Sequence, residues 1–128
     1  MICLSKTSEQ EIKNFLWEFK YLIRNGDFYV IPRDENNRGL IALGITVKSQ
    51  KKRLLELGKL DYSSGPTRDI DHSSEVWIFG IAINTTEVYI KLKIVYRHTG
   101  NKAKCLSFHP AEEPLSYPLK PEKTKPDT

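Results

Sequence analysis

Hydrophobic residues recur every three or four positions near the start of the chain, which is the spacing of a helix with one buried face. They form a single broad apolar stripe, made up of Ile12, Phe15, Leu16, Phe19, Leu22 and Ile23. Ser8 and Glu11 stand just ahead of this stripe in the S-x-x-E pattern of a capping box, and Gly26 is a suitable C-terminal stop. The pattern therefore predicts a first helix that packs on the core.

Two shorter helices and one strand are predicted next. Residues 28–32 favour a short strand, which its proline confines to an edge or an end of a sheet. Residues 36–43 suit a short helix closed by Gly44, and Thr46 suits the N-cap of a helix over residues 47–57.

The second half of the chain changes to the alternation that is typical of strands. Residues 63–74 are polar and rich in turn formers, so a loop is predicted there. Strands are predicted at residues 76–83, 88–96 and 102–109, with short turns between them. Helices followed by an antiparallel meander predict an α+β fold, with N-terminal helices packed on a small antiparallel sheet.

Alternation also separates the two faces of the last two strands. In the strand at residues 88–96, every second side chain is aliphatic and is expected in the core: Val88, Ile90, Leu92 and Ile94. The residues between them should face the other way: Tyr89, Lys91 and Lys93. In the last strand Leu106 and Phe108 form the matching core pair, and the residues left on the opposite face are Cys105, Ser107 and His109.

A hairpin loop centred near Thr99 would fix how these strands pair. It would place Tyr89 opposite His109, Lys91 opposite Ser107, and Lys93 opposite Cys105. A slip by one residue would bury the lysines, which argues for this register. We therefore expect a tyrosine, two lysines, a serine and a histidine to share one open sheet face.

These side chains suit cleavage of RNA through its own 2′-hydroxyl, which needs an acid, a base and cations but no metal. His109 can act as acid or base, and Lys91 and Lys93 can stabilise the phosphate. Tyr89 can orient the substrate, donate a proton or stack on a base. The alternative is that these residues are only the solvated face of a half-buried sheet, where tyrosine and lysine are common.

The chain of 128 residues carries a net charge of +4, which is compatible with a phosphate-bearing partner but does not establish one. On the predicted helix at residues 47–57, Lys51, Lys52 and Arg53 could contact RNA phosphates, or they could form an ordinary solvated face. Arg68, in the predicted polar loop, is a further candidate for a phosphate contact.

Other features narrow the class of protein. Two cysteines without metal-ligand spacing predict neither a disulfide framework nor a zinc site, and no cofactor is expected. No apolar run approaches the ~20 residues that span a bilayer, and the first residues lack a secretion signal, so a cytoplasmic protein without a membrane partner is expected. Five of the seven prolines follow residue 109. The predicted organisation is one domain at residues 1–109 and a Pro-rich, partly disordered tail at residues 110–128.

Several stretches together resemble the motility quorum-sensing regulator (MqsR) toxin family. They are Leu43-Gly44-Ile45-Thr46, residues 57–62, Val76-Trp77, residues 87–94 and Ser107-Phe108, and the similarity extends over roughly residues 16–109. The resemblance implies a RelE-like fold and a toxin that cuts mRNA without a metal. The ribosome is a further candidate partner. It also implies neutralisation by a cognate antitoxin. It places the family's catalytic tyrosine on Tyr89 and its strand lysine on Lys91.

The chain departs from the family pattern at polar positions. His109 replaces the lysine that follows Ser-Phe in the family, Ser64 replaces another lysine, and Ile78 replaces a glutamine. The leading hypothesis is therefore a toxin of a type II toxin–antitoxin system that acts as a metal-independent endoribonuclease. The main rival is a catalytically inactive toxin-like module that binds RNA or protein. A third hypothesis is a metal-dependent enzyme that uses Asp69, Asp71 and His72.

Overall fold

The computed structural model describes residues 7–68 and 75–121. The elements, in chain order, are α1 (Glu9–Arg24), β1 (Phe28–Val30), α2 (Asp34–Leu43), α3 (Val47–Leu55), the 3-10 turn η1 (Lys59–Asp61), β2 (Tyr62–Arg68), β3 (Glu75–Ile83), β4 (Thr86–Val95) and β5 (Lys102–Pro110). Within these described ranges no helix is long and apolar enough to cross a membrane.

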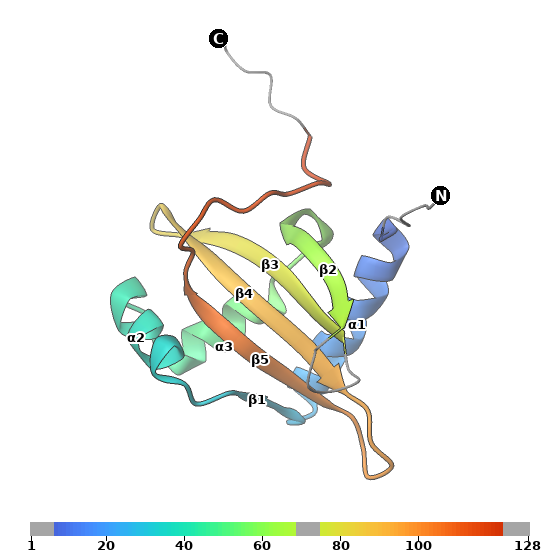
Figure 1. Cartoon of the computed structure of the whole chain (residues 1–128). Helices are drawn as coiled ribbons and strands as arrows, with labels where there is room; N and C mark the ends of the chain where they lie inside the picture. The colour runs from blue at the N-terminus through green and yellow to red at the C-terminus, as the bar shows by residue number, and fades with distance from the viewer. Residues whose placement is uncertain (1–6, 69–74, 122–128) are drawn as a thin grey trace.

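The five strands form one sheet in the order β1-β5-β4-β3-β2. Strands β2 to β5 are antiparallel to their neighbours, whereas β1 lies parallel to β5 at the sheet edge, so the sheet is mixed rather than purely antiparallel. Helices α1 and α3 lie behind the sheet in Figure 1, and the described part of the chain places no helix on the opposite face. The predicted α+β fold, with N-terminal helices packed on a sheet, is confirmed.

Helix α1 forms for the reasons that its sequence suggests. The Ser8 hydroxyl accepts from the Glu11 backbone N–H, and the Glu11 carboxylate accepts from the Ser8 N–H, which completes the capping box. All six residues of the predicted apolar stripe are buried. The stripe packs on the sheet through aromatic contacts, and the Phe15 and Trp77 rings stack with centroids 4.5 Å apart.

The predicted loop at residues 63–74 is wrong over its first half, because β2 continues to Arg68. This polar segment can form a strand because it lies at the sheet edge, where pairing with β3 needs only backbone groups. Its register with β3 shifts twice, and Gly65, within the second shift, adopts a φ of +104°. A side chain at Gly65 would lie 2.7 Å from the Val76 carbonyl oxygen, so the close approach of the two strands requires glycine.

Candidate functional site

The open face of β4 and β5 brings the predicted tyrosine and histidine together. Tyr89 lies opposite His109, and Lys91 lies opposite Ser107, as the sequence predicts. The four aliphatic residues of β4 that were expected in the core are 0–3% exposed. Because directly opposed residues in an antiparallel pair project from the same side, these four polar side chains share one surface.

The predicted pairing of Lys93 with Cys105 is wrong. A register shift follows Lys91, so that Leu92 pairs with Cys105 and Lys93 pairs with Lys104. Leu106 is the extra residue of this β-bulge, which reverses the facing of every earlier residue of β5. Cys105 consequently lies in the core, where burial raises the pKa of its thiol to about 12.

Lys104 takes the place on the open face that was predicted for the cysteine. Its ammonium lies 5.0 Å from the centre of the Tyr29 ring on the neighbouring β1, a cation–π contact. Lys93 beside it is largely buried, with 6% of its surface exposed. The open face therefore carries a row of three lysines, which we call the lysine row: Lys91, Lys93 and Lys104.

The rings of Tyr89 and His109 are stacked, with centroids 5.5 Å apart and planes inclined by 26°. His109 Nδ1 lies 3.0 Å from the carbonyl oxygen of Pro110. When Nδ1 carries the proton and donates it to this oxygen, Nε2 keeps a free lone pair and can act as a base. Burial raises the pKa of the Tyr89 phenol, which keeps it protonated and able to donate a hydrogen bond.

Asn36 of α2 fixes the end of β5 that carries these residues. Its side-chain nitrogen donates to the carbonyl oxygens of Ile31 and Leu106, at 2.9 and 3.1 Å, and its side-chain oxygen accepts from the Phe108 N–H at 3.0 Å. Strand β1 ends at Val30, so it does not pair with this end of β5. The Asn36 amide bonds the β5 backbone groups that a longer β1 would otherwise pair. The bonds hold the backbone on both sides of Ser107.

The segment after β5 folds back over the open face. Glu87 of β4 accepts from the Leu115 N–H at 3.1 Å and from the Tyr117 hydroxyl at 2.5 Å. Leu115 and Tyr117 lie against Gly80 of β3, where a Cβ would meet both side chains, the Leu115 methyl at 2.6 Å. We call residues 111–121 the strap; the rest of the predicted disordered tail, residues 122–128, lies outside the described residues.

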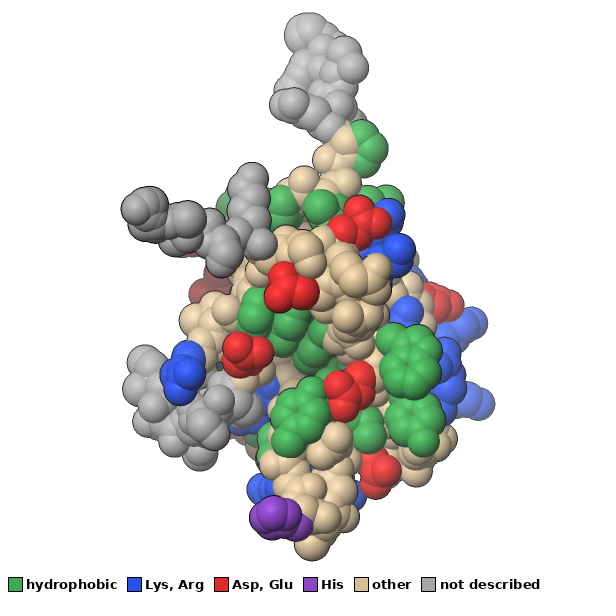
Figure 2. Space-filling model, turned by 90° about the vertical axis from the view of Figure 1, so that its right-hand side faces the viewer, with side chains coloured by type: hydrophobic (Ala, Val, Ile, Leu, Met, Phe, Trp, Pro, Cys, Tyr) green, Lys and Arg blue, Asp and Glu red, His purple; other side chains and the backbone are tan. Residues whose placement is uncertain are grey.

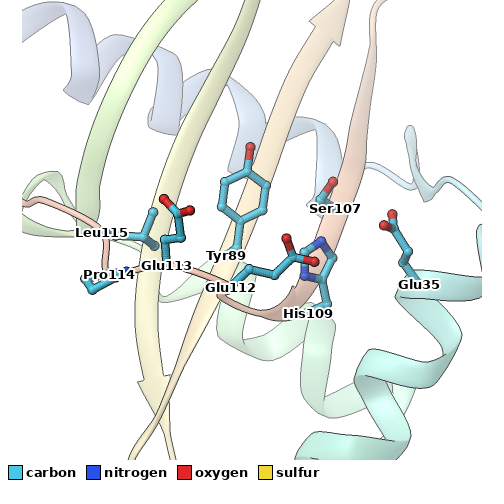
Figure 3. A pocket seen from close by; sticks show the side chains of 8 residues that line it. All are labelled: Glu35, Tyr89, Ser107, His109, Glu112, Glu113, Pro114 and Leu115. Carbon is cyan, nitrogen blue, oxygen red and sulfur yellow. The ribbon is translucent and has the colours of Figure 1, made fainter.

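The strap, the sheet and α2 together line an open pocket of about 470 Å³. Figure 3 shows the Tyr89 and His109 rings inside it, with Glu112 and Glu35 near the histidine and Glu113 beyond the tyrosine. The lining residues are Glu35, Tyr89, Ser107, His109, Glu112, Glu113, Pro114 and Leu115. Sequence reasoning missed the three glutamates. The alternation of Leu115, Tyr117 and Leu119 was the one available sign that the strap packs on the domain.

Other predicted RNA-contacting residues lie elsewhere. Lys51, Lys52 and Arg53 belong to α3, which lies on the helix-covered side of the sheet (Figure 1). Arg68 is the exposed last residue of β2, and β3 separates that strand from β4. The structure does not bring these four residues to the Tyr89–His109 pair.

The third hypothesis, a metal-dependent enzyme, rests on Asp69, Asp71 and His72, which lie outside the described residues. Among residues 7–68 and 75–121, no group of three or more His, Cys, Asp or Glu side chains could hold a metal ion.

A second hollow lies between α1 and η1. It is lined by Lys13, Leu16, Trp17, Lys20, Arg24, Leu57, Gly58 and Lys59. On this side of the molecule, large hydrophobic side chains lie beside lysine and arginine side chains (Figure 2). Two of these positive charges are partly offset, since the Glu9 carboxylate lies 3.8 Å from the Lys13 ammonium and 2.6 Å from that of Lys59.

Comparison with known proteins assigns no relative. No protein-family model matches the chain, and neither a curated protein nor a solved structure matches it at the significance required.

Proposed function

We propose that this protein is a metal-independent endoribonuclease of the toxin type, acting across the open face of β4 and β5. The observation that carries the proposal is the stacked Tyr89–His109 pair beside the Lys91–Ser107 pair. An ionisable ring, a phenol and a cation on neighbouring positions of one rigid sheet are what 2′-hydroxyl cleavage requires.

In the proposed reaction His109 Nε2 removes the proton of the RNA 2′-hydroxyl. The 2′-oxygen then bonds to the adjacent phosphorus, and the bond from phosphorus to the 5′-oxygen breaks. The products are a 2′,3′-cyclic phosphate and a 5′-hydroxyl, whose proton comes from the Tyr89 phenol or from water. Lys91 stabilises the negative charge that develops on the phosphate oxygens.

The biological setting follows from the family resemblance in the sequence. We propose mRNA as the substrate, in the cytoplasm and with or without the ribosome. A cognate antitoxin would then hold the enzyme inactive, as expected for a type II toxin–antitoxin pair.

One observation favours the alternative of an inactive RNA- or protein-binding module. The pocket around His109 is lined by three glutamates, and none of its lining residues is a lysine or an arginine. Negative charge at this place opposes the close approach of a phosphate to the histidine. Binding without cleavage would be the outcome if this repulsion prevails.

The test is cleavage of a defined RNA by the purified protein in EDTA. Parent protein should cut the RNA and leave 2′,3′-cyclic phosphate ends, and His109→Ala and Lys91→Ala should each reduce the rate by at least about 100-fold. His98→Ala, which removes an exposed histidine of the β4–β5 hairpin, is the matched control and should keep the parent rate. Equal cleavage by all four proteins would refute this site, and RNA binding without cleavage would support the inactive module.

A further inference from the structure

The pocket beside His109 has a composition unlike that of a phosphate site. Three carboxylates reach it from two separate elements, Glu35 from α2 and Glu112 and Glu113 from the strap. Ionised carboxylates only accept hydrogen bonds. The pocket therefore favours a ligand that presents several N–H or O–H donors.

Ser107 places a hydroxyl at the base of this pocket, where a ligand can bond to it. The residue is only 4% exposed, yet it lines the pocket. Among the described residues its hydroxyl makes no hydrogen bond, and it is not one of the fully buried polar atoms, so it faces the pocket, where water or a ligand can reach it. Figure 3 shows Ser107 and His109 on the same face of β5.

We propose that this pocket binds a nucleobase that carries an amino group, and that it discriminates against uracil. The proposal rests on the endoribonuclease function proposed above and specifies how that enzyme would select its RNA. The pocket would take the base, while Lys91 and Lys104 of the lysine row would take the phosphates that flank it. Glu35, Glu112 and Glu113 are then the residues that determine specificity.

The physical reason is hydrogen-bond complementarity. Guanine, adenine and cytosine each present an amino group, whose N–H bonds can be donated to a carboxylate. Uracil presents its single N–H between two carbonyl oxygens, which carboxylates repel. The Tyr89 ring offers a face on which any base can stack, so stacking would supply affinity and the glutamates would supply selectivity.

The strap makes this pocket a fixed part of the fold. Leu115 and Tyr117 are held by Glu87, and the Ala111 N–H donates to the Glu87 backbone carbonyl at 2.8 Å. Glu112 and Glu113 lie between these anchored points, so their backbone positions are restricted before any ligand binds, while their side chains are exposed. Such preorganisation reduces the entropic cost of binding.

The experiment measures binding without cleavage. Four 2′-O-methyl heptanucleotides would carry A, C, G or U at the centre and abasic residues elsewhere, and fluorescence anisotropy would give Kd for each. We expect the uracil probe to bind the parent protein roughly tenfold more weakly than the guanine probe. Glu35→Gln/Glu112→Gln/Glu113→Gln should reduce this ratio to within about twofold, because a carboxamide can also donate to carbonyl oxygens.

Glu56→Gln, an exposed glutamate on the C-terminal side of α3, is the matched control and should keep the parent ratio. Equal binding of all four probes, no binding of any probe, or a ratio unchanged in the triple variant would overturn the inference. These outcomes are separate from catalysis, which the EDTA assay measures. Base discrimination without cleavage would support the pocket while refuting the endoribonuclease.

Discussion

Glu87 and Tyr117 are joined by a hydrogen bond of 2.5 Å, from the tyrosine hydroxyl to the carboxylate. The second oxygen of the same carboxylate accepts from the Leu115 N–H. One side chain of β4 thus attaches the strap to the sheet, and the strap forms one wall of the candidate site. The stability of the domain and the shape of the site are therefore coupled through Glu87.

Removing the Tyr117 hydroxyl should weaken this attachment. We expect Tyr117→Phe to lower the free energy of unfolding by about 1 kcal/mol, since a hydrogen bond to a charged acceptor is lost at a half-buried site. Urea unfolding followed by circular dichroism measures the change. Tyr21→Phe, at an exposed tyrosine of α1, should leave the unfolding midpoint unaltered. Identical midpoints for both variants would show that the hydrogen bond does not stabilise the strap.

Asn36 should be far more sensitive than its neighbour Asn37. Asn36→Ala removes three hydrogen bonds and leaves the Leu106 carbonyl and the Phe108 N–H without the amide, while the Ile31 carbonyl still accepts from the Arg33 N–H, so we expect a loss of about 3 kcal/mol. Asn37→Ala, on the exposed side of α2, should cost less than about 0.5 kcal/mol. Thermal and urea unfolding of both variants give the comparison. A small effect at Asn36 would mean that water replaces the amide.

The sequence predicted the helices and the central hairpin because their signals are local. The capping box at Ser8 and the aliphatic alternation of β4 depend on neighbouring residues alone. These signals were sufficient to place Tyr89 opposite His109 and Lys91 opposite Ser107. The part of the candidate site that these two pairs form was therefore predictable from the hydrophobic pattern and the position of the turn.

The features that failed depend on contacts between distant segments. A single extra residue, Leu106, turns Cys105 into the core. Strict alternation from Leu106 and Phe108 would have buried Lys104 and Lys102, and this conflict was the sign of the bulge in the sequence. The polar β2 forms through backbone pairing at an edge, which side-chain pattern does not report. The apolar residues Leu115 and Tyr117 suggest that the strap packs on the domain, but the place where it packs depends on the space that Gly80 leaves on β3.

Alkaline pH should destabilise the domain partly through Tyr96. Partial burial of this residue, which is 63% exposed, followed by the hydrogen bond to Glu18, raises the pKa of the Tyr96 phenol to about 12 from its ordinary value of 10.0. Below pH 10 the phenol is protonated in both the folded and the unfolded state, so it adds no pH dependence. Between pH 10 and pH 12 the Tyr96 phenol loses its proton in the unfolded state before it does so in the folded state. The free energy of unfolding therefore falls as the pH rises.

Tyr96→Phe removes this contribution, so its stability should fall less steeply than that of the parent above pH 10. Urea midpoints at pH 8, 10 and 11 measure both slopes, and the pH 8 values supply the baseline for the lost hydrogen bond to Glu18. Parallel curves for the two proteins would contradict the raised pKa.

The bulge at Leu106 can be tested through the reactivity of Cys105. Cys3→Ser leaves Cys105 as the single thiol of the chain. Because burial raises its pKa to about 12, this thiol should react with Ellman's reagent at pH 8 only after urea is added, when one equivalent is released. Rapid reaction of the folded protein would place Cys105 on the open face, as simple alternation predicts. It would also restore the pairing with Lys93 and remove Lys104 from the lysine row.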